Sequence, residues 1–164
     1  MSKIKMFNHC VWYLIKPTHT IYRSMATYTT LLDTPNFLPH ITIQSGLTKE
    51  KAFQIAYRFQ NHEKPMFSPS GCPKISKTTF KSSVRTQDLE FYAVEQALNT
   101  NGIYVNGIHI SLAYSINRPI TQMELAMAPY TKRFYPMDLD VVVADCSDED
   151  PNKWYIVDSC VRET

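Results

Sequence analysis

Two short apolar runs, each carrying a histidine and, two residues later, a hydroxyl side chain, constrain the fold of this chain most. They are Pro39-His40-Ile41-Thr42-Ile43 and Ile108-His109-Ile110-Ser111-Leu112. Runs rich in Ile and Leu with this alternation predict buried β-strands. Because side chains alternate along a strand, each histidine points to the same face as the hydroxyl that follows it. Two such faces turned towards each other would gather two imidazoles and two hydroxyls in one cleft.

The chain is long enough to build a core around these strands. Its 164 residues, 44% hydrophobic and 20% charged, are typical of a globular protein with one domain or two closely packed lobes. A net charge of +2 without a basic block permits an anionic ligand and does not demand a nucleic-acid groove. Residues 1–10 have no long apolar run, so neither a signal peptide nor a membrane span is predicted.

Cysteine spacing indicates a reducing compartment. No C-x-x-C pair occurs among Cys10, Cys72, Cys146 and Cys160, so neither a thiolate metal site nor a redox motif is predicted. Buried free thiols are the expected state of these cysteines. We therefore expect a cytoplasmic protein, and a monomer.

Hydrophobic periodicity and turn residues predict an α+β chain with two similar halves. Strands are predicted at 10–15, 38–44, 74–86, 108–114, 137–146 and 154–161, and helices at 18–32, 48–60, 88–99 and from 121 to near 129. Ser45-Gly46 is expected to end the first histidine strand, and a hairpin is expected to join the last two strands. The Pro- and Ser-rich segment 64–73 is the best linker candidate. Halves 1–63 and 74–164 would then form one bilobal, duplicated domain.

The residue types of the two motifs suit proton transfer around a phosphorus atom. A neutral imidazole accepts a proton from an attacking hydroxyl, and an imidazolium donates one to a departing oxygen. Hydroxyl side chains can donate hydrogen bonds to the non-bridging oxygens of a phosphate held between the rings. The predicted catalytic residues are His40, His109, Thr42 and Ser111. The two rings need different protonation states, and either histidine fits either role.

A single His-x-Thr is more often structural than catalytic, whereas two copies in strands are much less expected by chance. The other histidines, His9, His19 and His62, lack such a pattern and fit surface or helix-end positions. A zinc site at His40 and His109 would lack a carboxylate or cysteine at ligand spacing. No metal and no cofactor are therefore expected.

The paired motifs resemble the signatures of the two-histidine (2H) phosphoesterase superfamily and are most similar to its cyclic phosphodiesterase, LigT-like branch. Supporting features are Val11-Trp12 on the first strand, Pro39 before the first histidine, and an acidic loop that leads to Trp154 and a last strand. The resemblance covers about residues 10–161. It implies a bilobal α+β fold in which two antiparallel sheets face each other across a central cleft, with helices outside. It also implies metal-independent cleavage of phosphodiesters that involve a ribose 2′ or 3′ oxygen.

The sequence departs from the family pattern at two places. Ser111 stands where threonine is commoner, which keeps the hydroxyl. The stretch Thr79-Phe80-Lys81-Ser82 only partly matches the aromatic residues that relatives place over the cleft. Aromatic rings that stack on bases and a cation that contacts phosphate complete the predicted site, and the predicted substrate-binding residues are Trp12, Tyr114, Phe80 and Lys81.

Three kinds of function remain open at this stage. The leading one is a phosphodiesterase, a hydrolase of 2′,3′-cyclic phosphates or of 2′-linked or cyclic nucleotides and short oligonucleotides. Within it, a degrader of cyclic dinucleotide or 2′-5′-oligoadenylate immune messengers, as viral and phage members of the superfamily are, has no support from particular residues. A non-catalytic RNA-end-binding module and a structural or interaction domain are the other two.

Overall fold

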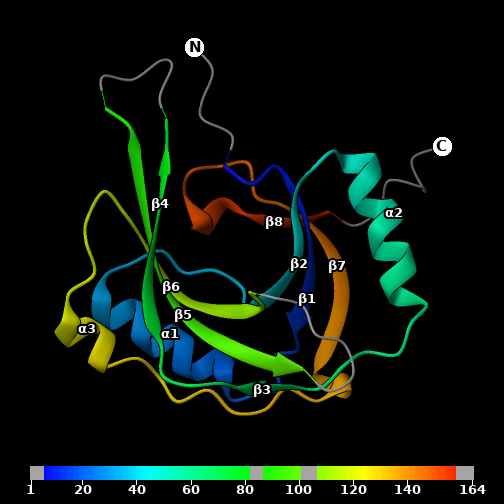
Figure 1. Ribbon diagram of the computed structural model, residues 1–164, viewed down its shortest axis with the longest axis horizontal. Helices are drawn as coiled ribbons and strands as arrows, with labels where there is room; N and C mark the ends of the chain where they lie inside the picture. The colour runs from blue at the N-terminus through cyan, green and yellow to red at the C-terminus, as the bar shows by residue number, and fades with distance from the viewer. Residues whose placement is uncertain (1–5, 82–86, 101–106, 158–164) are drawn as a thin grey trace.

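The chain folds into an α+β structure built on one mostly antiparallel, eight-stranded sheet (Figure 1). The computed structural model describes residues 6–81, 87–100 and 107–157. The strands are β1 (His9–Ile15), β2 (His40–Leu47), β3 (Phe67–Pro69), β4 (Lys74–Phe80), β5 (Leu89–Thr100), β6 (His109–Ile116), β7 (Leu139–Asp145) and β8 (Tyr155–Val157). The helices are α1 (Ile21–Leu32), α2 (Lys49–Gln60) and α3 (Gln122–Ala126), with short 3-10 helices at Pro136–Asp138 and Pro151–Lys153. The predicted α+β class is therefore confirmed.

A narrow junction divides the sheet into two parts. The order along the sheet is β3-β5-β6-β2-β1-β7-β8, and β4 also pairs with β5. Strands β1 and β7 pair along the whole of β1, whereas β2 and β6 are joined through one residue pair, Ile41 and Ile110. We call β2, β1, β7 and β8 the β1 part of the sheet, and β3, β4, β5 and β6 the β5 part. In Figure 1 the two parts lie on opposite sides of the molecule.

Helices α1 and α2 form from amphipathic stretches, as predicted, and each buries its apolar face against the sheet. Helix α1 packs against β6, and α2 packs against β1 and β7. The N-cap of α2 is Thr48, which accepts a hydrogen bond from the backbone N–H of Lys51 at 3.2 Å. The predicted capping box of α3 is also present, formed by Thr121 and Glu124. The histidine strands β2 and β6 are thus each followed by a helix.

The prediction of a helix at 88–99 is wrong, because this segment is strand β5. Both of its faces are buried: Phe91 and Ala93 belong to one apolar cluster, whereas Tyr92 and Val94 belong to another on the other face. A strand that is apolar on both faces loses the polar-apolar alternation that reveals a strand in a sequence. The predicted end of that helix, Asn101-Gly102, lies outside the described residues.

Two predicted breaks are also absent from the fold. Strand β2 continues through Ser45-Gly46 to Leu47, because Gly46 adopts a positive φ of 72° and donates its backbone N–H to the Phe7 carbonyl at 2.7 Å. The predicted linker at 64–73 contains β3, which pairs with β5 and buries Phe67. A segment with three prolines can still add a short edge strand to a sheet.

The remaining predicted elements are present with shifted ends. The predicted hairpin joins β7 and β8, and the rest of the last predicted strand, 158–161, lies outside the described residues, as does 82–86 after β4. Cys10 and Cys146 are buried free thiols as predicted, whereas Cys72 is exposed and Cys160 is not described. No helix in the described ranges is long and apolar enough to cross a membrane.

Candidate active site

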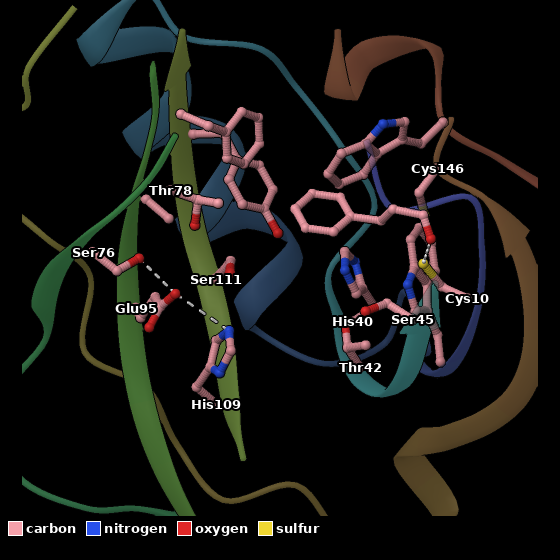
Figure 2. A pocket seen from close by; sticks show the side chains of 16 residues that line it. Cys10, His40, Thr42, Ser45, Ser76, Thr78, Glu95, His109, Ser111 and Cys146 are labelled. Atoms are coloured by element: carbon pink, nitrogen blue, oxygen red, sulfur yellow. Dashed lines mark hydrogen bonds and ion pairs between the residues drawn. The ribbon is translucent and has the colours of Figure 1, made fainter. Parts of the chain in front are cut away.

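A cavity of about 230 Å³ lies beside the junction of the two parts of the sheet (Figure 2). It is lined from the β1 part by His40 and Thr42, and from the β5 part by His109 and Ser111. These residues flank Ile41 and Ile110, the buried pair that joins β2 to β6. The structure therefore brings the four predicted catalytic residues together in one cavity.

His40 is held in a single orientation by two contacts. Its Nδ1 lies 2.7 Å from the Leu38 carbonyl oxygen, and because a carbonyl only accepts, Nδ1 carries the proton. Its ring stacks on Trp12, with centroids 3.6 Å apart and planes 11° from parallel. The side chain is buried, with 4% of the residue exposed. This burial, assisted by the charge of His109, lowers the pKa of His40 to about 4, although the bond to Leu38 opposes the shift.

His109 repeats the anchoring of His40 in a more open place. Its Nδ1 donates to the Gly107 carbonyl oxygen at 2.9 Å, again two residues earlier in the chain. The side chain is 36% exposed, and its Nε2 lies 3.5 Å from Oε1 of Glu95. Both histidines thus use Nδ1 for a backbone bond, which leaves Nε2 of each ring for chemistry.

Glu95 is a cavity residue that the sequence reasoning missed. It lies on β5 opposite Ser111, and Ser76 of β4 donates a hydrogen bond to its Oε1 at 2.7 Å (Figure 2). No carboxylate lies at metal-ligand spacing from either histidine in the sequence, but the fold brings Glu95 beside His109. Alternate residues of β5, namely Phe91, Ala93 and Glu95, all line the cavity. This alternation would have identified Glu95 as a cavity residue if the segment had been recognised as a strand.

The His, Cys and Glu side chains that line the cavity are not arranged as a set of metal ligands within the described residues. Among residues 6–81, 87–100 and 107–157, no three or more His, Cys, Asp or Glu side chains are placed so that they could hold a metal ion. The hydroxyls of Ser45, Ser76 and Thr78 add polar lining instead. Within the same ranges no lysine or arginine lines the cavity.

Aromatic side chains form the other wall of the cavity. Tyr114 packs against Phe91 at a centroid distance of 5.0 Å and against Trp154 at 5.3 Å. Burial raises the pKa of Tyr114 above its ordinary value, and the nearby Ser111 side chain opposes this rise. Strict alternation along β6 would place Tyr114 and Ser111 on opposite faces. A register shift between the pairs of Val94 and Glu95 puts both on the cavity face.

The four predicted substrate-binding residues fall into two groups. Trp12 and Tyr114 line the cavity, but Trp12 is 2% exposed and gives one ring face to His40. Phe80 lies behind the wall, edge-on to Phe7 at 5.5 Å, and is not a lining residue. Lys81 is also outside the lining, because its 85% exposed side chain reaches Asp88 at 3.1 Å. Direct substrate contacts from Phe80 and Lys81 remain predictions.

No model of a known protein family matches the chain, and no curated protein sequence matches it. What can be inferred about its activity therefore depends on the site. The site brings two imidazoles, the hydroxyls of Thr42 and Ser111, one carboxylate beside His109 and an aromatic wall to one cavity. Such a set can move protons to and from an anionic centre while a flat apolar group rests on the rings.

Proposed function

We propose that the chain is a metal-independent phosphodiesterase that cleaves 2′,3′-cyclic phosphates or 2′-linked or cyclic nucleotides and short oligonucleotides. The observation that carries the proposal is the convergence of both His-x-Thr/Ser motifs on one cavity from opposite sides of the sheet junction. Two imidazoles and two hydroxyls are the groups that metal-free cleavage of a phosphodiester needs.

In the proposed reaction the phosphorus lies between the two rings. One Nε2 removes the proton of the attacking hydroxyl while a new P–O bond forms, and the other protonates the leaving oxygen while the old P–O bond breaks. Each transfer contributes roughly 100-fold to 10,000-fold to the rate. Thr42 and Ser111 donate hydrogen bonds to the non-bridging oxygens, where charge develops.

The aromatic wall favours a nucleotide over other phosphodiesters. Tyr114, Phe91 and Trp154 line the same cavity as the two motifs, so a base can rest on the rings while its phosphate lies at the histidines. Stacking of one base on such rings contributes about 1 to 3 kcal/mol and tolerates any base.

Membership of the two-histidine superfamily and its two-lobed fold belong to the same proposal. The single residue pair between β2 and β6 supports it, because a sheet so nearly divided at Ile41 and Ile110 resembles two sheets that meet at one edge. The similar anchoring of His40 and His109 by the carbonyl two residues earlier supports a duplicated origin.

The test is cleavage of a substrate panel after treatment of the protein with EDTA. The panel contains nucleoside 2′,3′-cyclic phosphates, 2′-5′ oligoadenylates and cyclic dinucleotides, so that the immune-messenger alternative is one of its outcomes. We expect at least one class to be cleaved, and His40→Ala or His109→Ala to lower the rate at least about 100-fold. His62→Ala is the matched control, because His62 lies at the end of α2, where it bonds Arg58. Loss of activity with EDTA, full activity of either histidine variant, or binding of RNA ends without turnover would refute the proposal.

A further inference from the structure

Glu95 contacts His109 on its chemical side. Because Nδ1 of His109 is engaged by the Gly107 carbonyl, a group at Nε2 acts on the proton that the reaction moves. Oε1 of Glu95 lies 3.5 Å from that Nε2, and Figure 2 shows the carboxylate between Ser76 and His109. His40 differs, since no carboxylate forms an ion pair with it within the described part of the chain.

We propose that Glu95 holds a proton on Nε2 of His109, and that His109 is therefore the general acid and His40 the general base. This inference rests on the proposed phosphodiesterase function. A carboxylate oxygen only accepts, so its contact with Nε2 is favourable when that nitrogen carries a proton. With Nδ1 also donating, His109 is then an imidazolium.

The surroundings of His40 give it the opposite state. Its Nδ1 proton is directed to the Leu38 carbonyl, which leaves a lone pair on Nε2. Burial keeps the ring neutral near pH 7, since the pKa of His40 is lowered to about 4. A neutral ring of this tautomer can accept a proton at Nε2 and has none to donate there. The other titratable side chains that line the cavity are Tyr114 on β6, Cys10 on β1 and Cys146 after β7.

Ser76 fixes the carboxylate in place. Its hydroxyl donates to Oε1 of Glu95 at 2.7 Å across the β4–β5 pair, on the side away from His109 (Figure 2). Glu95 is thus a positioning residue, which acts on the reacting atoms through His109. The imidazolium proposed at His109 would also add positive charge that attracts the phosphate.

The assignment sets the path of both protons. Nε2 of His40 takes the proton from the attacking hydroxyl, whose oxygen bonds to phosphorus. The electron pair of the breaking P–O bond goes to the leaving oxygen, which takes the proton from Nε2 of His109. After one turnover His40 carries the extra proton and His109 is neutral. Loss of the first proton to water and uptake of a proton at His109 beside Glu95 restore the starting state.

The first arm of the test is the pH profile of kcat/KM for Glu95→Gln. We expect its alkaline limb to move to lower pH than in the wild type, with KM changed little and the acidic limb unmoved. Glu95→Asp should restore part of the shift. Glu90→Gln is the matched control, because Glu90 lies on the same strand and pairs with Lys77. An alkaline limb that stays in place in Glu95→Gln would overturn the role of Glu95.

The second arm needs no change at Glu95 and so holds even if Glu95→Gln fails to fold. It compares a nucleoside 2′-phosphodiester that has a 4-nitrophenyl leaving group with one that has an alkyl leaving group. A 4-nitrophenolate departs without a proton, so His109→Ala should lose less than about tenfold on it and more than about 100-fold on the alkyl ester. His40→Ala should lose more than about 100-fold on both. The reverse pattern would overturn the assignment and leave the proposed function intact, whereas full activity of both variants would refute the function itself.

Discussion

At the scale of single residues, the site depends on the contrast between two histidines with the same backbone anchor. His40 is buried against Trp12, and His109 is more exposed beside Glu95. Burial disfavours a charged ring, whereas a carboxylate favours it. One motif repeated in two environments is therefore expected to have two chemical characters, as the proposed pair of acid and base requires.

Burial of His40 predicts a pH-dependent stability. Its pKa is about 4 in the folded protein against 6.5 for an ordinary histidine, so between these values the unfolded chain binds more protons. The stabilising contribution is complete above pH 6.5 and is lost as pH falls from 6.5 to 4, by about 3 kcal/mol in total. Urea unfolding across this range measures it. His40→Gln should flatten the slope and His62→Gln should not, and equal slopes in all three proteins would contradict the burial of a neutral ring.

The hydroxyls should matter less than the imidazoles. Thr42→Val removes one hydrogen-bond donor at nearly constant volume, and we expect kcat to fall about tenfold to 100-fold. Thr42→Ser keeps the donor and should retain most of the activity. Steady-state kinetics of both variants with one cleaved diester measures the change in kcat. If Thr42→Val is as active as Thr42→Ser, the Thr42 hydroxyl has no part in catalysis.

At the scale of elements, the two histidine strands could be predicted because they are short, aliphatic and bounded by turn residues. Strand β5 could not be predicted, because burial of both its faces removes the polar-apolar alternation by which a strand is recognised. Glu95 lies on this strand and was therefore not recognised as a site residue. Strict alternation along β6 also fails to predict that Tyr114 faces the cavity, because that position depends on a register shift between β5 and β6. Local sequence patterns can identify a strand, whereas its bulges and register shifts depend on the strands it pairs with.

The continuation of β2 through Gly46 can be tested at this scale. Gly46 has a φ of 72°, and a Cβ placed there would meet no atom within 4 Å. Gly46→Ala should therefore lower the free energy of unfolding through backbone strain alone, by about 1 kcal/mol. Gly46→Asn should lower it less, because asparagine tolerates this conformation better. Urea denaturation measures both, and a neutral Gly46→Ala would show that the strand bends elsewhere.

At the scale of the whole molecule, the site exists because the sheet narrows to one residue pair where the two motifs meet. Each part of the sheet is extensively paired within itself, and each contributes one histidine and the hydroxyl of the same motif. The sequence predicted the two copies and their shared chemistry. It did not predict that both belong to one continuous sheet, because strand neighbours distant in the chain leave no local pattern.

The junction pair should couple stability to activity. Ile110 is fully buried beside His109 and Ser111, so Ile110→Ala should cost about 2 to 5 kcal/mol of unfolding free energy and also lower kcat/KM. Leu139 of β7 is equally buried and outside the cavity lining, so Leu139→Ala should cost similar stability with activity preserved. Unfolding and kinetic measurements on both variants test this. Equal losses of activity would show that the junction has no special part in placing the motifs.

The most direct test of the central claim is the kcat/KM of EDTA-treated wild type, His40→Ala, His109→Ala and the double variant on the best diester of the panel. If the two histidines act as one unit, each single variant loses about 100-fold or more, and the double variant is little worse than either. The wild-type profile should be bell-shaped in pH. Retention of wild-type activity by either single variant would contradict a phosphodiesterase built on His40 and His109.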